Sequence, residues 1–357
     1  MKNTLDRNEP DTGTRLQNLG WRPHFSQQLS IDETNDCLPV RVVAVHRSEL
    51  HVVGSGFEAV VPPIRNDDEE DRATIGDWLL LERETNRVIR RLERFSQFKR
   101  RAPGSARGVQ LIAANVDTLM IVSSCNDDFN IARIERYLAV AREAEVTPVV
   151  VLTKADMAEA PEEYRRAAEK LMPLLLVETL DATDKMEVAS LNAWCGAGQT
   201  IAFVGSSGVG KSTLTNSLLG GQSVATQAIR EDDAKGRHTT THRALYQLPA
   251  GGWVLDTPGI RELQLTDVAE GISELFNDLE ELVAQCRFHD CQHVTEPDCA
   301  VRDALEDGSL DEERFKRWRK LLAENERNSL SLAQARAKDK NFSKMVNRTI
   351  KGKPNRR

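Results

Sequence analysis

The sequence predicts a multidomain α/β protein, and three observations support this fold class. From Leu38 to about residue 112, short apolar runs separated by Gly, Pro and Asn/Asp predict an N-terminal antiparallel β-barrel of OB type. After Val116, buried-type strands alternate with amphipathic helices, which is typical of a parallel α/β domain. After about Leu265 the chain is mostly helical and carries a Cys/His cluster, which predicts a helical zinc-binding domain. The expected divisions are a flexible leader (1–36), the OB-type barrel (37–112), the α/β domain (113–265), the zinc-binding domain (266–330) and a basic tail (331–357).

The overall composition is that of a soluble globular protein. The chain has 357 residues, of which 40% are hydrophobic and 29% charged. No run approaches the ~20 apolar residues of a membrane span, and the N-terminus lacks the apolar core of a signal peptide. We therefore expect a cytoplasmic, monomeric protein with no membrane partner. In a reducing cytosol, the clustering of Cys286, Cys291 and Cys299 favours a metal site over a disulfide framework.

The charges are strongly segregated along the chain. The net charge is −7, but nine Lys/Arg face two acids between Arg83 and Arg107, and nine face only Asp339 between Arg336 and Arg357. One such run alone is typical of a solvated face or a disordered tail. Two separate runs on an acidic protein favour an anionic partner, because clustered cations gain from releasing phosphate counterions.

Five β-type runs define the predicted barrel. They are LPVRVVAVH, LHVVGSG, FEAVVPP, DWLLLERE and RVIRRLERF. An OB-type barrel of about five strands is a scaffold that often binds oligonucleotides. The polar residues before it, 1–36, predict a flexible leader.

The α/β domain contains a phosphate-binding loop. GSSGVGKS follows the apolar strand TIAFV and leads into the helix-like KSTLTNSLLG. Glycines let successive backbone N–H groups face phosphate oxygens, and the start of the following helix directs its positive end at the same anion. Lys211 is expected to reach the β/γ-phosphates and Ser212 to ligate Mg²⁺. The expected contact residues are Gly205, Ser206, Ser207, Gly208, Val209, Gly210, Lys211, Ser212 and Thr213.

A second strand end supplies further phosphate-side groups. DTPG follows the strand GWVL, so Asp256 can hold Mg²⁺ through water while the Gly259 N–H faces the γ-phosphate. Between this motif and the phosphate loop lies KGRHTTTHR, in which one of Thr239, Thr240 and Thr241 is a candidate second Mg²⁺ ligand; we take Thr240.

The motif TKAD decides which base is read. A carboxylate at Asp156 can accept hydrogen bonds from guanine N1–H and its exocyclic amine, a pair that adenine does not offer, while the Lys154 stem can lie along the base. The motif follows the buried strand VVVL, and in that position it favours guanine over adenine. Asn is common where this chain has Thr153, so the connection from that side chain to the phosphate loop is expected to be weaker. The adjoining base-contact segment falls near VETLDA, Val177 to Ala182, where no single contact residue is predicted.

The order TKAD, GSSGVGKS, GRHTTT, DTPG resembles that of the circularly permuted GTPases. With the N-terminal barrel and the C-terminal Cys/His cluster, residues 38–330 closely resemble the ribosome small subunit-dependent GTPase A (RsgA/YjeQ) family. The resemblance implies a circularly permuted P-loop GTPase domain. It also implies GTP hydrolysis to GDP, stimulated by the small (30S) ribosomal subunit during its late maturation, with 16S rRNA as partner.

The hydrolytic step lacks one expected side chain. Many GTPases orient the attacking water with a glutamine after the DxxG glycine, but that position is Ile260 here, so slow intrinsic turnover is expected. His238, in GRHTTT, is the best internal replacement, as the resemblance also suggests. The alternative is that His238 is only a solvent-exposed loop residue.

Four potential zinc ligands lie within 14 residues: Cys286, Cys291, His293 and Cys299. This number and type of donors suits a closed tetrahedral site, in which one zinc is structural. His289 is a competing ligand, and the resemblance favours His293. In the helix predicted for Asp311–Arg327, core packing is expected of Phe315, Trp318, Leu321 and Leu322, rather than base stacking.

Three function classes are compatible with parts of this pattern. The first is an RNA-dependent GTPase that acts on the small ribosomal subunit. The second is a nucleotide-gated RNA-binding adaptor for which hydrolysis is incidental. The third, an ATP-dependent kinase or transporter-type ATPase, is disfavoured by Asp156 and by the absence of a substrate domain.

Overall fold

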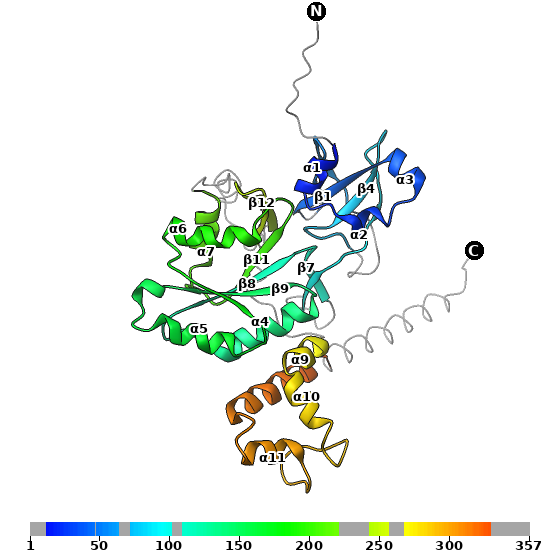
Figure 1. Ribbon diagram of the computed structural model, residues 1–357. Helices are drawn as coiled ribbons and strands as arrows, with labels where there is room; N and C mark the ends of the chain where they lie inside the picture. Colours follow the sequence, from blue (N-terminus) through cyan, green and yellow to red (C-terminus); the bar gives the residue numbers. More distant parts are fainter. Residues whose placement is uncertain are drawn as a thin grey trace, which may run out of the picture.

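A large mixed sheet runs through the computed structural model, which describes residues 12–46, 48–63, 72–101, 109–220, 243–256 and 268–329. Eleven strands of these residues belong to the sheet, in the order β10-β9-β8-β11-β13-β12-β1-β2-β3, with β4 paired to β1 and β5 paired to β4. Its parallel half belongs to the α/β domain and its antiparallel half to the N-terminal part (Figure 1).

The parallel half consists of strands that are mostly buried, apart from the edge strand β10. These strands are β8 (Thr118–Ser124), β9 (Thr147–Thr153), β10 (Leu176–Thr179), β11 (Thr200–Val204) and β13 (Trp253–Asp256), with β12 (Arg243–Gln247) antiparallel to β13. Continuous apolar runs suit a sheet that is covered on both faces. The covering helices are α4 (Ile131–Glu143) and α5 (Pro161–Glu169) on one face, and α6 (Lys185–Val188) and α7 (Lys211–Leu218) on the other (Figure 1). Short 3₁₀ segments lie at Ala155–Met157 and Ala189–Trp194.

All five strands predicted for the N-terminal part are present. They are β1 (Cys37–Val45), β2 (Leu50–Gly54), β3 (Phe57–Val61), β4 (Trp78–Glu82) and β5 (Val88–Arg91), all paired antiparallel. A separate hairpin follows, formed by β6 (Gln97–Arg101) and β7 (Val109–Ala114). The end of β1 also pairs with β12, at Ala44–Ala244 and Val45–Arg243. The N-terminal strands therefore continue the sheet of the α/β domain.

Residues 12–36, which the sequence led us to expect as part of a flexible leader, form three short helices. These are α1 (Thr12–Asn18), α2 (Pro23–Ser26) and α3 (Ile31–Asp36). Phe25 is fully buried, and its ring lies 5.7 Å from that of Trp78. The loop after α1 is fixed by two donors, since Arg41 donates to the Leu19 carbonyl and the Trp253 indole to the Asn18 carbonyl. A few apolar residues are enough to hold these short helices in place, because they pack against a surface that the strands already form.

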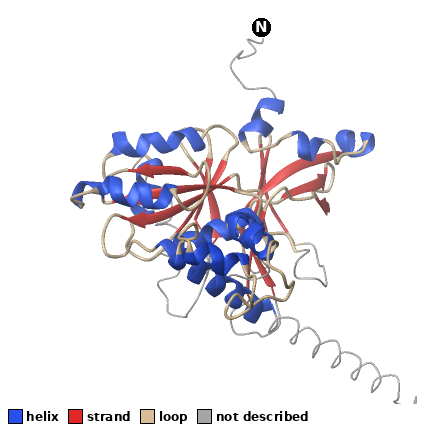
Figure 2. Cartoon of the chain, turned by 60° about the horizontal axis from the view of Figure 1, so that its bottom comes forward, coloured by secondary structure: helices blue, strands red, loops and turns tan. Residues whose placement is uncertain are grey.

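The C-terminal part is helical, as predicted. It contains α9 (Ala269–Leu275), α10 (Asn277–Val283), α11 (Ala300–Glu306) and a helix over 312–329. In Figure 2 these helices gather in front of the strands. Phe315, Trp318 and Leu321 are buried in the core, which confirms their predicted packing role. No helix in the described part of the chain is both long and apolar enough to span a bilayer.

Helix α4 is the contact between the α/β domain and this C-terminal part. Gly271 of α9 lies so close to α4 that a Cβ there would come 2.0 Å from the Ala139 carbonyl oxygen. The fully buried Glu135 carboxylate accepts a hydrogen bond from Arg317 Nε at 2.8 Å. Burial raises the pKa of Glu135, and the Arg317 hydrogen bond opposes that rise.

Candidate active site and metal cluster

The carboxyl ends of the parallel strands define the candidate active site. Strands β8, β9, β10, β11 and β13 are parallel and end at the same edge of the sheet. From β8 the chain continues to β9 on one side, and from the neighbouring strand β11 it continues towards β13 on the other side. Ligands of open α/β sheets bind at such a reversal of strand order. A pocket of about 410 Å³ lies there, formed by the loops that follow β9, β10 and β11.

The phosphate loop connects β11 to α7 and lines one side of the pocket. Gly205 and Gly210 have φ values of 139° and 97°, in the region that favours glycine. A Cβ on Gly205 would also come 2.2 Å from the Val122 carbonyl oxygen. Gly210 is the N-cap of α7 and no side chain caps the helix, so its first N–H groups can face an anion. The loop residues at the pocket are Ser207, Gly208, Gly210, Lys211, Ser212 and Thr213.

The Lys211 ammonium is held against the loop itself. Lys211 is 8% exposed, and its Nζ donates to the carbonyl oxygens of Gly205, at 2.8 Å, and Ser206. These contacts keep a positive charge at the pocket wall, where phosphate oxygens would lie.

Thr153 connects the predicted base-reading segment to the phosphate loop. Its buried hydroxyl donates to the Val209 carbonyl at 2.6 Å and lies 3.2 Å from the Ser123 carbonyl. A weaker connection was expected from a threonine in place of asparagine. The short distance shows that the hydroxyl reaches the loop directly.

The opposite side of the pocket holds the predicted base-reading residues. Lys154 has φ 58° and Asp156 lies in the following 3₁₀ turn, and both line the pocket. Sequence reasoning named no contact residue in the loop after β10, but the structure adds Asp181, Ala182 and Thr183 from that loop. These residues reach the pocket because β10 pairs in parallel with β9, which brings the carboxyl ends of both strands to the same edge of the sheet. Met157 was also missed.

A polar cluster from the start of α4 contacts the outer side of the phosphate loop. Arg133 Nη1 donates to Ser206 Oγ at 2.6 Å and to Asp128 Oδ2 at 3.0 Å, while Ser206 Oγ donates to the same carboxylate. The Ser206 hydroxyl and the Arg133 guanidinium hold the pKa of Asp128 below its ordinary value. No motif in the sequence indicated this cluster, because Asp128 and Arg133 lie more than seventy residues before Ser206.

Several predicted site residues lie outside the described part of the chain. They are His238, Thr240 and Gly259. Asp256 is the last residue of β13, whose parallel pairing with β11 directs the chain to the phosphate-loop edge.

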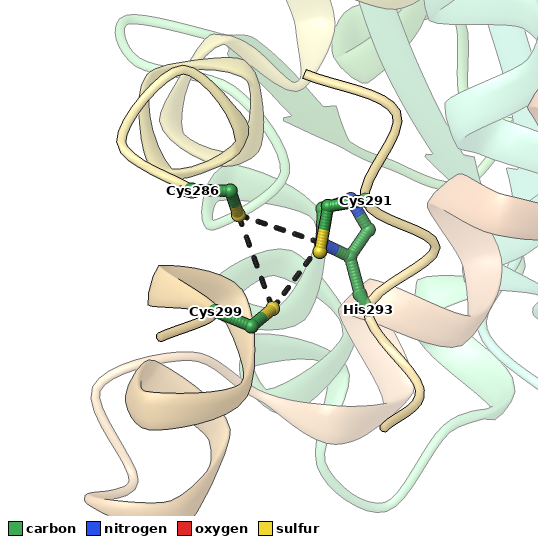
Figure 3. Close-up of side chains that lie close together, drawn as sticks. All are labelled: Cys286, Cys291, His293 and Cys299. Carbon is green, nitrogen blue, oxygen red and sulfur yellow. Dashed lines mark hydrogen bonds between the residues drawn. The ribbon is translucent and has the colours of Figure 1, made fainter. Parts of the chain in front are cut away.

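The Cys/His cluster forms at the far end of the C-terminal part. Cys286 follows α10, Cys299 precedes α11, and Cys291 and His293 come from the loop between them (Figure 3). Their four ligand atoms lie within 4.8 Å of one another. His293 Nδ1 lies 3.4 Å from Cys299 Sγ, and the Cys286 and Cys299 sulfurs are 3.9 Å apart. Two zinc–sulfur bonds at a tetrahedral angle span about 3.8 Å. The donors therefore fit one tetrahedral metal ion, with His293 rather than His289 as the nitrogen ligand.

The first basic run serves the fold more than the sequence suggested. Arg94 forms an ion pair with the fully buried Asp77 at 2.7 Å, Arg90 pairs with Glu33 at 2.7 Å, and Arg100 is 6% exposed. Arg83 and Arg87 are exposed. Only part of this run is therefore open to an anionic partner, and the second run lies outside the described residues.

Comparison with known proteins gives a consistent set of relatives. The family model of the RsgA GTPase matches residues 91–266. A small ribosomal subunit biogenesis GTPase RsgA of Mesorhizobium japonicum is 51% identical over 320 residues, covering 88% of this chain and 91% of the relative. A small ribosomal subunit biogenesis GTPase RsgA 2 of Vibrio parahaemolyticus is 48% identical over 345 residues, covering 97% and 95%.

Solved structures show the same fold. The crystal structure of YjeQ from Thermotoga maritima superposes with a TM-score of 0.60 at 25% identity, covering 81% of this chain and 98% of that one. The structure of YloQ, described as a circularly permuted GTPase, gives a TM-score of 0.58 at 22% identity, covering 82% and 96%. The permuted order of motifs and the identity to these relatives along nearly the whole chain lead to one assignment: the chain belongs to the RsgA GTPase family.

Proposed function

We propose that this chain hydrolyses GTP during the biogenesis of the small ribosomal subunit, and that the subunit stimulates hydrolysis. The observation that carries the proposal is the meeting of three loops, after β9, β10 and β11, in one pocket. Relatives that share about half of its residues are named small ribosomal subunit biogenesis GTPases.

Each side of the pocket has a distinct task. Asp156 accepts hydrogen bonds from the guanine N1–H and amine, and the Lys154 stem covers the base. The phosphate loop and the N-terminus of α7 bind the phosphates, and Lys211 compensates the charge that develops between the β- and γ-phosphates. Ser212 and Thr240 would hold Mg²⁺, which neutralises phosphate charge when bound. Asp256 and Gly259 complete the γ-phosphate side.

Attack by water needs a polar group that Ile260 cannot supply. We assign this role to His238, which lies between the phosphate loop and Asp256 in the chain. Slow hydrolysis by the free protein and fast hydrolysis on the subunit follow if contact with the subunit places His238 beside the attacking water.

The remaining parts serve RNA binding. The Cys286–Cys299 cluster would hold one structural zinc, because it offers four protein donors and leaves no position for water. The N-terminal strands form an OB-type barrel, whose exposed basic residues and the tail 331–357 would bind 16S rRNA. The protein acts as a cytoplasmic monomer.

The alternative is a nucleotide-gated RNA-binding adaptor with incidental hydrolysis. Steady-state GTP turnover with and without purified 30S subunits separates the two. A large stimulation supports the proposal, whereas equal turnover with retained subunit binding supports the adaptor.

A second experiment tests the base assignment. GTP and ATP are competed against a fluorescent GTP analogue on the parent chain and on Asp156→Ala. We expect the parent to prefer GTP strongly and the variant to lose that preference. Preference for ATP in the parent would contradict the guanine assignment.

A further inference from the structure

Ser206 has two different partners on its two polar groups. Its carbonyl accepts from the Lys211 ammonium, which also donates to Gly205. Its hydroxyl is bound by Asp128 and Arg133. One loop residue therefore joins the phosphate-binding lysine to an ion pair that lies outside the loop.

The ion pair of Arg133 and Asp128 lies at the beginning of α4, which other contacts hold in place. Asn130 caps α4 by accepting a hydrogen bond from the Arg133 N–H at 2.9 Å. Two residues further along the helix, Glu135 is fully buried and bonded to Arg317. The beginning of α4 is thus fixed both by its own cap and by the C-terminal part, and it can hold Ser206 in place.

We propose that Arg133 and Asp128 are positioning residues for GTP hydrolysis, acting through Ser206 on Lys211. Arg133 bonds to both Ser206 and Asp128, and Asp128 accepts from the Ser206 hydroxyl, so the peptide whose carbonyl orients the Lys211 ammonium cannot rotate freely. Charge grows on the phosphates in the transition state, so an ammonium in the wrong place lowers the rate more than it weakens binding. The inference rests on the proposed role of Lys211.

Exposure separates this role from a purely structural one. The Arg133 and Asp128 side chains are 37% and 38% exposed. Exposed ion pairs contribute little to stability. A positioning role therefore predicts a loss of turnover without a matching loss of stability.

The first experiment compares Arg133→Ala with a matched control. Arg165→Ala removes another arginine of the same domain, whose ion pair with Glu169 is similarly exposed at 44% and 43%. We expect Arg133→Ala to lower kcat for GTP roughly tenfold, as for loss of one charge-assisted hydrogen bond, with KM within about twofold and an unchanged thermal midpoint. Arg133→Lys, which keeps the charge, should recover part of the loss. Arg165→Ala should match the parent.

A double-mutant cycle tests whether the effect passes through Ser206. If it does, Asp128→Asn and Ser206→Ala together should lower kcat no more than the larger single effect. Additive losses would overturn the route through Ser206, and an unchanged kcat in Arg133→Ala would overturn the proposal as a whole. So would a loss of kcat matched by a fall in thermal midpoint, or a rise in KM alone.

The parent and Lys211→Ala are measured in the same assay. Turnover in the parent and its loss in Lys211→Ala establish GTP hydrolysis at this pocket independently of Arg133. Failure of the Arg133 prediction is then distinct from failure of the function itself.

Discussion

The Thr153 hydroxyl donates to the Val209 carbonyl across 2.6 Å, so the segment proposed to read the base is bonded directly to the phosphate loop. The two residues are 56 positions apart in the chain. Thr153 ends β9, whereas Val209 lies in the loop after β11, and these two strands are not adjacent in the sheet. The hydrogen bond crosses β8, which lies between β9 and β11. It sets the separation between the two sides of the pocket.

Removing this hydroxyl should weaken GTP binding. Thr153→Val preserves shape but leaves the Val209 carbonyl without its donor, so we expect roughly tenfold weaker affinity. Thr179→Val is the matched control, because within the described residues the buried Thr179 hydroxyl has no hydrogen-bond partner. Titration with a fluorescent GTP analogue measures both. Equal affinities in the two variants would show that the Thr153 hydrogen bond does not support the pocket.

Zinc binding should depend on His293 and not on His289. We expect one zinc per purified chain, measured by elemental analysis, with most of it lost in His293→Ala and retained in His289→Ala. The reason is that His293 Nδ1 lies 3.6 Å from Cys286 Sγ, inside the cluster that excludes His289. A metal-free parent, or zinc loss in His289→Ala alone, would contradict the assignment.

His238 should affect stimulated hydrolysis but not nucleotide affinity. We expect His238→Ala to bind GTP like the parent and to lose roughly 100-fold or more of the subunit-stimulated rate, in the range of a group that orients or deprotonates water. His242→Ala changes another histidine of the same segment and serves as control. Full stimulation in His238→Ala would remove this residue from the mechanism.

The attachment of α3 should weaken in acid. Glu33 accepts hydrogen bonds from Arg90 and from the Ser30 N–H, which together lower its pKa from 4.5 to about 2. A lowered carboxyl pKa means stability that is present above pH 4.5 and lost as the pH falls towards 2. Thermal melts of the parent and Glu33→Gln should therefore differ by a few degrees at pH 7 and converge in that window. Asp32→Asn, which removes an exposed charge from the same turn, should show a smaller and less pH-dependent difference.

Local patterns were sufficient for much of this protein. Continuous apolar runs identified four strands of the α/β domain, β8, β9, β11 and β13, but not β10 or β12. The phosphate loop was recognisable because its glycines and lysine lie within eight consecutive residues. The four candidate metal ligands lie within 14 residues, so their spacing alone indicated a site. Each of these features is formed by residues that are close together in the chain, so a local sequence pattern is enough to predict it.

Features built from distant residues needed the tertiary structure. The sparse apolar residues of 12–36 gave no helical period, yet Phe25 is buried because a surface around Trp78 receives it. In the sequence Arg94 is only one member of a basic run, and the structure shows that it forms an ion pair with Asp77.

The sequence by itself determined the permuted order of motifs, the candidate base reader Asp156 and the cluster of candidate metal ligands. Only the tertiary structure decided that Thr153 bonds to Val209, that the loop after β10 lines the pocket, and that Asp128 and Arg133 hold Ser206. The physical reason is that parallel pairing brings the ends of distant strands to one edge, where contacts form between residues that no local pattern connects.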